Sequence, residues 1–296
     1  MTKSTKEDEV MDISHINRIL SQIGYPHPAV AYSPFCAEED GSEYSVWKIE
    51  TDHGPVVLKK ATGLEKNTYE SFFPDGGGPL PRVYGFHDDY ILMEYVEGHT
   101  LSRCTREDLI LALDGLIEMQ KQYWNREDLA HGGYGFEKCF ANREKRLPYM
   151  EDLGNCYKAY LAEFSSVPRT LCNDDLLPFN VIISGSRAVF LDWEFGGILP
   201  YPCALVRLIA YGEEDDHALF YMKREDQIFA VEYYYEHLIR EKGIPYDAYI
   251  RTMKLFFFKE YSEWIYCANE SGDLSSEYYK KYSVMARKLA AEIGYA

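Results

Sequence analysis

The spacing of apolar and polar residues along this chain changes at about residue 98. Before that point, short alternating segments are separated by glycine, proline and aspartate, which is typical of strands joined by turns. The strands predicted from this pattern are Ala29–Phe35, Tyr44–Glu50, Pro55–Lys60, Arg82–Phe86 and Tyr90–Val96, and one short helix is predicted at Gly63–Phe73.

After Gly98 the spacing becomes helical. Thr105 is followed three residues later by Asp108, a capping pattern, and apolar residues then recur at steps of three and four. The predicted helices are Thr105–Trp124, Leu153–Phe164, Asp226–Lys242, Tyr246–Glu270 and Ser275–Ile293. Strands first and helices afterwards favour an α+β chain with a small β-rich lobe (residues 1–97) and a larger helical lobe (residues 98–296).

One short β-hairpin is predicted inside the helical half. The segments 181–183 and 188–191 are apolar and rich in β-branched residues, and the turn Ser184-Gly-Ser-Arg187 joins them. Asn180 precedes the first strand and Asp192 follows the second. A hairpin of this kind brings both side chains to the same end.

Composition and charge restrict the class of protein. The chain has 296 residues, of which 46% are hydrophobic and 15% aromatic, so a folded protein with a substantial core is expected. A net charge of −17 argues against a nucleic-acid partner, because little would neutralise the phosphates. The acidity either attracts a cationic substrate or simply maintains solubility.

The seven cysteines are scattered and none forms a Cys-x-x-Cys pair. We therefore expect neither a zinc site nor a disulfide framework, and free thiols favour a cytoplasmic location. No apolar run approaches the ~20 residues needed to span a membrane, so no membrane partner is expected. The sequence carries no signal of oligomeric state.

The richest candidate chemistry lies around the hairpin. Asp175 precedes Asn180 by five residues, and Asp192 lies just beyond the second strand. Phosphoryl transfer from ATP needs a group that accepts the proton of the attacking hydroxyl and oxygen ligands for Mg²⁺ on the phosphates. We predict Asp175 as the proton acceptor and Asn180 and Asp192 as Mg²⁺ ligands. The alternative is a polar turn in which Asp175 and Asn180 only cap backbone groups.

Residues suited to binding ATP precede this segment in the chain. Val57 and Lys59 lie on one face of a predicted strand, where Lys59 would contact phosphates and Val57 the base. Glu65, on the following helix, would orient the lysine, and Glu70 is the competing candidate. The alternatives are an ordinary edge lysine and solvated surface acids.

Two further segments would complete a nucleotide site. The loop 36–43 lies where Gly41 and Ser42 would cover the phosphates, although its three acids make it a poor anion nest. Val46 would then line the adenine pocket. The strand that leads into Gly98 would offer the carbonyl of Glu94 and the amide of Val96 to the adenine edge.

Taken in order, these segments resemble the aminoglycoside phosphotransferase and choline kinase family over residues 27 to 210. The matching segments are Val-Leu-Lys59, the helix glutamate, Leu-Pro81-Arg-Val-Tyr-Gly-Phe, Ile-Leu-Met-Glu94-Tyr-Val-Glu-Gly98, Asn-Asp-Asp175-Leu-Leu-Pro-Phe-Asn180 and Leu-Asp192-Trp-Glu. The resemblance implies a bilobal, protein-kinase-like fold and ATP-dependent phosphorylation of a hydroxyl on a small molecule.

The chain departs from the family pattern at two places. The family usually carries His-Gly-Asp or His-Asn-Asp where Asn173 and Asp174 precede Asp175 here, although Asn173 retains the ability to hydrogen-bond the backbone. An Asp-Leu-Ala step is replaced by Ala204-Leu-Val, which removes a structural acid. These changes leave two alternatives, a divergent substrate and a catalytically silent nucleotide-binding module. A protein kinase is disfavoured because no Ala-Pro-Glu segment follows Asp192.

The acceptor is expected between Asp175 and the C-terminal helices. Acidic side chains there would suit an aminoglycoside or another amine, and aromatic faces would suit a quaternary ammonium such as choline. The candidate contacts are Glu194, Glu260, Glu263, Trp264, the acidic cluster Glu213–Asp216 and the aromatic run Tyr233–Tyr235. Core aromatics and solvated helix faces are the alternative for each of them.

Overall fold

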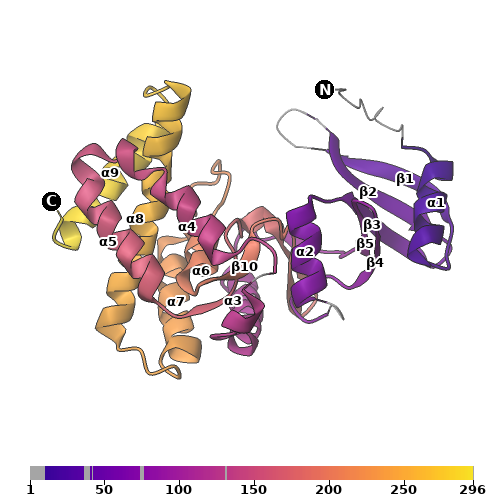
Figure 1. Cartoon of the computed structure of the whole chain (residues 1–296), viewed down its shortest axis with the longest axis horizontal. Helices are drawn as coiled ribbons and strands as arrows, with labels where there is room; N and C mark the ends of the chain where they lie inside the picture. The colour runs from indigo at the N-terminus through magenta and orange to yellow at the C-terminus, as the bar shows by residue number, and fades with distance from the viewer. Residues whose placement is uncertain (1–10, 37–40, 42, 74–76, 131, 296) are drawn as a thin grey trace.

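The protein divides into a β-rich part and a helical part, as the computed structural model in Figure 1 shows. The structure describes residues 11–36, 41, 43–73, 77–130 and 132–295. Helices α1 (Ile13–Ile23) and α9 (Glu277–Glu292) lie at opposite ends of the molecule. The predicted α+β, bilobal and protein-kinase-like architecture is confirmed.

The β-rich part contains a five-stranded antiparallel sheet with the order β1-β2-β3-β5-β4. Its strands are β1 (Ala29–Cys36), β2 (Glu43–Thr51), β3 (Gly54–Lys60), β4 (Val83–His87) and β5 (Tyr90–Glu94). All five predicted strands are present, but β5 ends at Glu94, two residues earlier than predicted. Ser42 and residues 37–40 of the predicted phosphate-covering loop lie outside the described residues.

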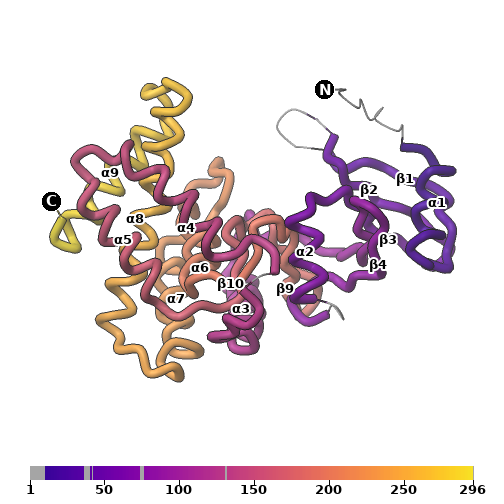
Figure 2. Tube along the Cα trace, in the orientation of Figure 1, coloured from indigo at the N-terminus to yellow at the C-terminus, as the bar shows by residue number. Residues whose placement is uncertain are grey.

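Helix α1 was not predicted, and it covers the outer face of this sheet (Figure 2). Its start is capped by Asp12, whose carboxylate accepts a hydrogen bond of 2.7 Å from the amide of His15. Its end is capped by Gly24 with φ +82°. The outer core consists of Ile16, Ile19, Leu20, Ala29, Ile49, Val56, Leu58 and Leu92.

The other face of the sheet looks toward helix α2 (Gly63–Phe72) and the helical part (Figure 1). Thr62 caps α2 through a hydrogen bond of 3.3 Å from the amide of Glu65 to its hydroxyl. The residue after the helix, Phe73, packs edge-to-face against Trp193 with ring centroids 4.8 Å apart. This aromatic contact joins the β-rich part to the segment that follows β9 (Arg187–Phe190) in the helical part.

The helical part is built around the long helix α8 (Tyr246–Ser271). The other helices are α3 (Arg106–Gln122), α4 (Phe136–Glu144), α5 (Gly154–Ser166), α6 (Pro202–Ile209) and α7 (Arg224–Tyr234). The predicted helical stretch 226–242 is confirmed as far as Ile239: α7 ends at Tyr234, a π-helical segment continues over Tyr235–Ile239, and a turn follows. No helix in the described part of the chain is both long and apolar enough to cross a membrane.

Two small sheets hold the loops that carry the candidate site. Strands β6 (His99–Thr100), β8 (Val181–Ser184) and β9 (Arg187–Phe190) form one sheet, and β7 (Arg169–Asn173) pairs with β10 (Gly196–Pro200) in the other. The predicted hairpin is confirmed as β8–β9, with Gly185 at φ +59° in its turn. Strands β7 and β10, together with α4 and α6, were not predicted.

Candidate active site

Lys59 lies between two carboxylates that come from distant parts of the chain. Its Nζ is 2.7 Å from Oε1 of Glu65 on α2 and 2.8 Å from Oδ1 of Asp192, which follows β9. Glu65 is only 2% exposed, whereas the side chain of Glu70 is 46% exposed and lies 3.8 Å from Lys66. The structure therefore places Glu65, and not Glu70, against the lysine.

Burial and charge act in opposite directions on this cluster. Burial alone would lower the pKa of Lys59, but the neighbouring carboxylates of Glu65 and Asp192 outweigh it and the pKa is raised. Burial raises the pKa of Glu65, and Lys59 opposes that shift. Lys59 is therefore held as a cation beside two acids, which is the charge state needed to contact nucleotide phosphates.

Asn173 joins the two loops of the site. Its Oδ1 accepts a hydrogen bond of 2.9 Å from the amide of Asp175, and its Nδ2 donates to the carbonyl of Asp192 at 2.8 Å. The residue is completely buried. The expectation that Asn173 still hydrogen-bonds the backbone is confirmed, and the bonds tie the Asp175 loop to the Asp192 segment.

Asn180 and Asp192 lie at the same end of the hairpin, because the amide of Leu191 donates to the carbonyl of Asn180 at 2.8 Å. The Nδ2 of Asn180 donates to the carbonyl of Asp175 at 3.0 Å, and its Oδ1 accepts no hydrogen bond from the described residues. The Asp192 side chain is 46% exposed and its backbone has φ +55°. One amide oxygen and one accessible carboxylate therefore come from the same end of the hairpin.

This pair of ligands fits a magnesium ion that arrives with a nucleotide. No group of three or more His, Cys, Asp or Glu residues in the described part of the chain is arranged to hold a metal without help. Mg²⁺ at kinase sites is usually bound by one or two protein groups and completed by substrate phosphates and water. Asn180 and Asp192 have the oxygen atoms that could supply the protein share of such a set.

Asp175 is paired with an arginine that the sequence did not indicate. The Nη2 and Nε of Arg207, near the end of α6, lie 2.6 and 3.1 Å from its Oδ1. No described residue makes a hydrogen bond to the other carboxylate oxygen, and the side chain is 32% exposed. Burial raises the pKa of Asp175, and the charge of Arg207 opposes that shift. Arg207 was missed because α6 has only 8 residues, too few for apolar spacing to distinguish a helix from a short buried strand.

The neighbouring Asp174 points the opposite way. Its carboxylate is 2.6 Å from Nη2 of Arg143, a residue of α4 that is only 3% exposed. Burial would raise the pKa of Asp174, but the charge of Arg143 outweighs it and the pKa is lowered. Of the two consecutive acids, Asp174 is thus a largely buried anion paired with Arg143, and Asp175 is the more accessible one.

The two acids proposed for the acceptor share a face of α8 and both contact cations. Glu260 is 3.1 Å from Arg207 and 2.9 Å from Lys259. Although burial opposes the shift, Lys259 and Arg207 lower the pKa of Glu260 to about 2. Glu263 is 2.6 Å from Arg146, and its Oε2 has no hydrogen-bond partner among the described residues and lies 3.7 Å from Lys259.

The other acceptor candidates lie in different surroundings. Trp264 stacks on Tyr278 and Tyr282 at 4.6 and 5.8 Å, and its buried Nε1 has no hydrogen-bond partner among the described residues. Glu194 is half-buried, directly after the buried Trp193. Tyr233 and Tyr235 pack against other aromatic residues on the α7 side of the helical part. None of these residues contacts Asp175.

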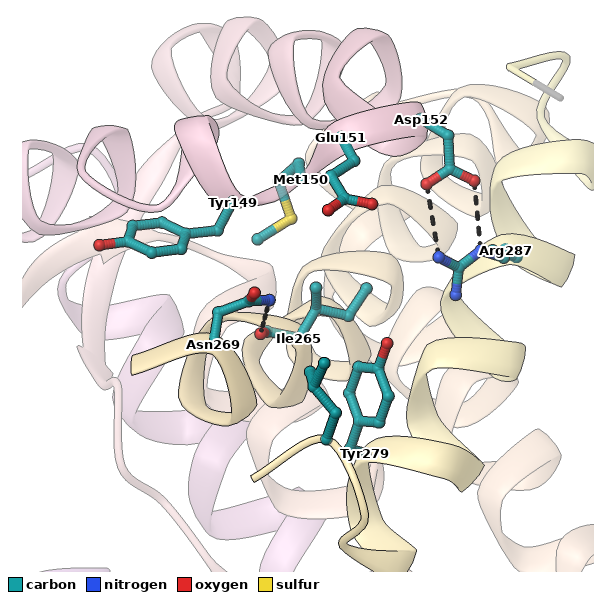
Figure 3. Close-up of a pocket in the computed structure, with 9 residues that line it drawn as sticks. Tyr149, Met150, Glu151, Asp152, Ile265, Asn269, Tyr279 and Arg287 are labelled. Carbon is teal, nitrogen blue, oxygen red and sulfur yellow. Dashed lines mark hydrogen bonds and ion pairs between the residues drawn. The ribbon is translucent and has the colours of Figure 1, made fainter. Parts of the chain in front are cut away.

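Two hollows in the helical part lie apart from Asp175. Figure 3 shows one of about 50 Å³, beside which Arg287 is 3.2 Å from Asp152. That volume is too small for a ligand larger than a few waters. The other, of about 310 Å³, is lined partly by Glu213 and Lys281, which form an ion pair, and by Tyr282. The acidic cluster Glu213–Asp216 therefore borders a cavity, but Asp175 is not among its lining residues.

The nucleotide side includes the remaining predicted residues. Val46 pairs with Lys59 in the β2–β3 register and is half-buried, and Val57 packs against the main core. The amide of Glu94 donates to the carbonyl of Arg82 at 2.8 Å. Val96 is buried, and Gly41 has φ +69° with open space around its Cα.

The carboxylate of Glu94 adds a contact between the two parts of the molecule. It lies 2.8 Å from Arg187 on β9. The end of the sheet strand is thus linked directly to the hairpin that precedes Asp192.

Comparison with known proteins shows the fold. No family model matches the sequence, and no curated protein matches it. Among solved structures, the choline kinase of Streptococcus pneumoniae is 16% identical with a TM-score of 0.59, and the match covers 94% of this chain and 99% of that one. The ethanolamine kinase of Plasmodium vivax is 14% identical with a TM-score of 0.58, covering 88% and 81%.

A third structure widens the range of substrates found on this fold. The macrolide 2'-phosphotransferase of Brachybacterium faecium is 14% identical with a TM-score of 0.58, and the match covers 92% of this chain and 97% of that one. The fold is therefore protein-kinase-like, of the kind found in small-molecule kinases. More particularly, aminoglycoside phosphotransferases are also among the matching structures, with a TM-score of 0.57 at 12% identity for one bound to ADP and hygromycin B, so the resemblance to choline kinases and aminoglycoside phosphotransferases is confirmed at the level of the fold.

Proposed function

We propose that this chain transfers the γ-phosphoryl group of ATP to a hydroxyl of a small molecule. The observation that carries the proposal is the position of Lys59, 2.7 Å from Glu65 and 2.8 Å from Asp192. A lysine paired with a helix glutamate and placed beside the metal-binding aspartate is the arrangement that phosphoryl transfer requires.

The proposed roles follow from the surroundings of each side chain. Lys59 binds the nucleotide phosphates, with Glu65 fixing its ammonium. Asn180 and Asp192 hold Mg²⁺, which when bound neutralises charge on the β- and γ-phosphate oxygens. Asp175 has one carboxylate oxygen without a hydrogen bond from the described residues, and this oxygen accepts the proton of the acceptor hydroxyl. Positioning of the two substrates contributes up to ~7–11 kcal/mol to the lowering of the barrier.

The acceptor is proposed here only as a hydroxylated small molecule. The sequence favoured a cationic acceptor bound by Glu260 and Glu263. Both carboxylates lie next to cations, Glu260 beside Lys259 and Arg207 and Glu263 beside Arg146. Their charges are therefore largely matched before any ligand binds, so they give a cationic acceptor little support.

A catalytically silent nucleotide-binding module is the second candidate. The ion pair between Asp175 and Arg207 favours it, because the arginine occupies one carboxylate oxygen and reduces the basicity that burial gives to Asp175. The two functions differ in one measurable respect. A silent module binds Mg-ATP and never releases ADP above the rate of buffer alone.

The test combines nucleotide binding with turnover on the same protein. Binding of Mg-ATP is measured by calorimetry, and ADP release is measured with hydroxylated acceptors of several charges. Asp192→Asn is expected to weaken Mg-ATP binding and stop ADP release, whereas Glu70→Gln, the exposed control on α2, is expected to change neither. Tight Mg-ATP binding by wild type without ADP release from any acceptor would favour the silent module. Equal turnover by Asp192→Asn and wild type would contradict both the metal role and the proposed reaction.

A further inference from the structure

Arg207 is the cation that faces the predicted proton acceptor. It lies in the last turn of α6, and its guanidinium contacts Asp175 with two nitrogens and Glu260 with the third. Tyr211, one turn later, places its hydroxyl 3.1 Å from Oε2 of Glu260 and so helps to hold this corner. The guanidinium therefore stands where the acceptor must bring its hydroxyl if Asp175 is to take the proton.

On the α6 and α8 side of Asp175, away from Asp192 and the Lys59 cluster, the charges leave no surplus of acid. Four carboxylates lie within salt-bridge distance of four cations through the pairs Arg143–Asp174, Arg207–Asp175, Lys259–Glu260 and Arg146–Glu263. A cationic acceptor placed against Asp175 would meet the charge of Arg207 without a spare carboxylate to balance it. An acceptor with a negative charge would instead be attracted by Arg207.

The geometry of the Arg207 contact favours an anionic ligand. The Nε and Nη2 edge of a guanidinium is a pair of parallel donors that matches the two oxygens of a carboxylate or phosphate. Here both donors converge on one oxygen, Oδ1 of Asp175, at 3.1 and 2.6 Å. A ligand with two anionic oxygens uses this edge more fully than Asp175 does. Its arrival would also release Asp175 to accept a hydrogen bond from the hydroxyl.

We infer that Arg207 is a specificity-determining residue that selects an acceptor with an acidic group, a carboxylate or a phosphate, close to the hydroxyl that is phosphorylated. The inference rests on the proposed function and narrows its substrate class. It places the acid of the acceptor on the Nε and Nη2 edge of Arg207. The hydroxyl of the acceptor then lies on the freed carboxylate of Asp175.

The test uses acceptors that differ only in the charge at one end. Two matched series serve as probes: gluconate, sorbitol and glucamine, and glycerate, glycerol and 3-aminopropane-1,2-diol. Sorbitol 6-phosphate adds the phosphate case. For each probe, ADP release with Mg-ATP gives kcat and KM, and calorimetry on the protein saturated with Mg-ADP gives a Kd that does not depend on turnover.

For wild type, we expect the acidic member of a series to have the lowest KM and Kd. In Arg207→Gln the KM and Kd of that member should rise about 10- to 100-fold, the range for loss of a charged hydrogen-bonding partner, with KM for ATP unchanged. Arg207→Lys should restore part of the preference for the acid. Arg251→Gln, which removes an exposed arginine of α8 that pairs with Glu163 and with none of these four carboxylates, should keep the preference.

Several results would overturn the inference. They are a lower Kd for the amine than for the acid in wild type, an equal loss for all three members in Arg207→Gln, and absence of measurable binding by every acidic probe. Failure of the proposed function gives a different result, because no probe then releases ADP. In that case the Arg207-dependent Kd of the acidic probes still decides the inference.

Discussion

The two halves of the candidate site use the same chemical groups with opposite charge balance. On the nucleotide side, one cation, Lys59, serves two carboxylates, Glu65 and Asp192. On the acceptor side, Arg207 contacts Asp175 and Glu260, and Lys259 gives Glu260 a second cation. Acid is in excess on the first side, and the second is close to neutral.

Under the proposed function, this difference separates the part of the site that would serve the common reaction from the part that would select the acceptor. The excess of acid beside Lys59 suits a divalent cation carried by a nucleotide, and that requirement is the same for every acceptor. The acceptor side has no such common requirement, so its charged residues can differ according to the charge of the acceptor. Asp175 lies between the two sides and is therefore the residue at which the comparison is most directly tested.

The largest effect is expected where the two sides meet. Asp175→Asn should lower kcat by about 10²- to 10⁴-fold, because it removes the group that accepts the proton. KM for ATP should change little, since Asp175 makes no contact with Lys59. Steady-state ADP release checks both quantities. Wild-type kcat in this variant would show that Asp175 does not accept the proton, and only the roles proposed for nucleotide binding would then stand.

The adjacent acid provides a matched contrast of stability against activity. Asp174→Asn should lower the free energy of unfolding by about 3–5 kcal/mol, because the buried charge of Arg143 loses its partner. Chemical denaturation followed by circular dichroism measures this change, and the folded protein should retain its kcat. A fall in kcat with unchanged stability would mean that the two consecutive acids have exchanged roles.

The pairing of Glu260 predicts a dependence of stability on pH. Its folded pKa of about 2 lies below the usual value near 4.3 for the unfolded chain, so its contribution is fully present above pH ~4.3 and is lost as pH falls toward 2. The difference between the folded and unfolded pKa values corresponds to about 3 kcal/mol in the free energy of unfolding. Between pH 5 and 2.5, the free energy of unfolding should therefore fall more steeply with decreasing pH in wild type than in Glu260→Gln. Denaturation curves recorded at each pH measure this free energy. Identical slopes would show that the acceptor side does not hold Glu260 charged.

The smallest effect is expected from the nucleotide side alone. Glu65→Gln should raise KM for ATP about 10- to 100-fold, because Lys59 loses one of its two charged partners and is held less firmly. KM for the acceptor should not change. If Glu70→Gln had the larger effect, the contact between Lys59 and Glu65 would not describe the active protein.

Much of the site could be predicted because it depends on short stretches of chain. Val57 and Lys59 share a face through strand alternation alone, and the hairpin places Asn180 and Asp192 together through a turn at Gly185. These arrangements need only local backbone geometry. The choice of Glu65 over Glu70 needed more, since both lie on α2 and only the packing of that helix buries one of them.

The remaining features depend on contacts between distant segments. Arg207 reaches Asp175 across 32 positions of the chain, and Arg143 reaches Asp174 across 31. Helices α6 and α4, which carry these arginines, have only 8 and 9 residues, so their apolar spacing repeats too few times to identify a helix. Helix α1 had a recognisable cap at Asp12 and Gly24, and it was missed although the signal was present.

By itself, then, the sequence determined the β-rich and helical halves, the five-strand succession of the first half and the hairpin that precedes Asp192. These properties follow from periodicity and turns, which act over a few residues. Only the tertiary structure decided which charges neutralise one another, because an ion pair forms between side chains that packing brings within about 4 Å, whatever their separation in the chain. The same acids that indicated a cationic acceptor in the sequence thus prove to be paired with arginine and lysine in the folded protein.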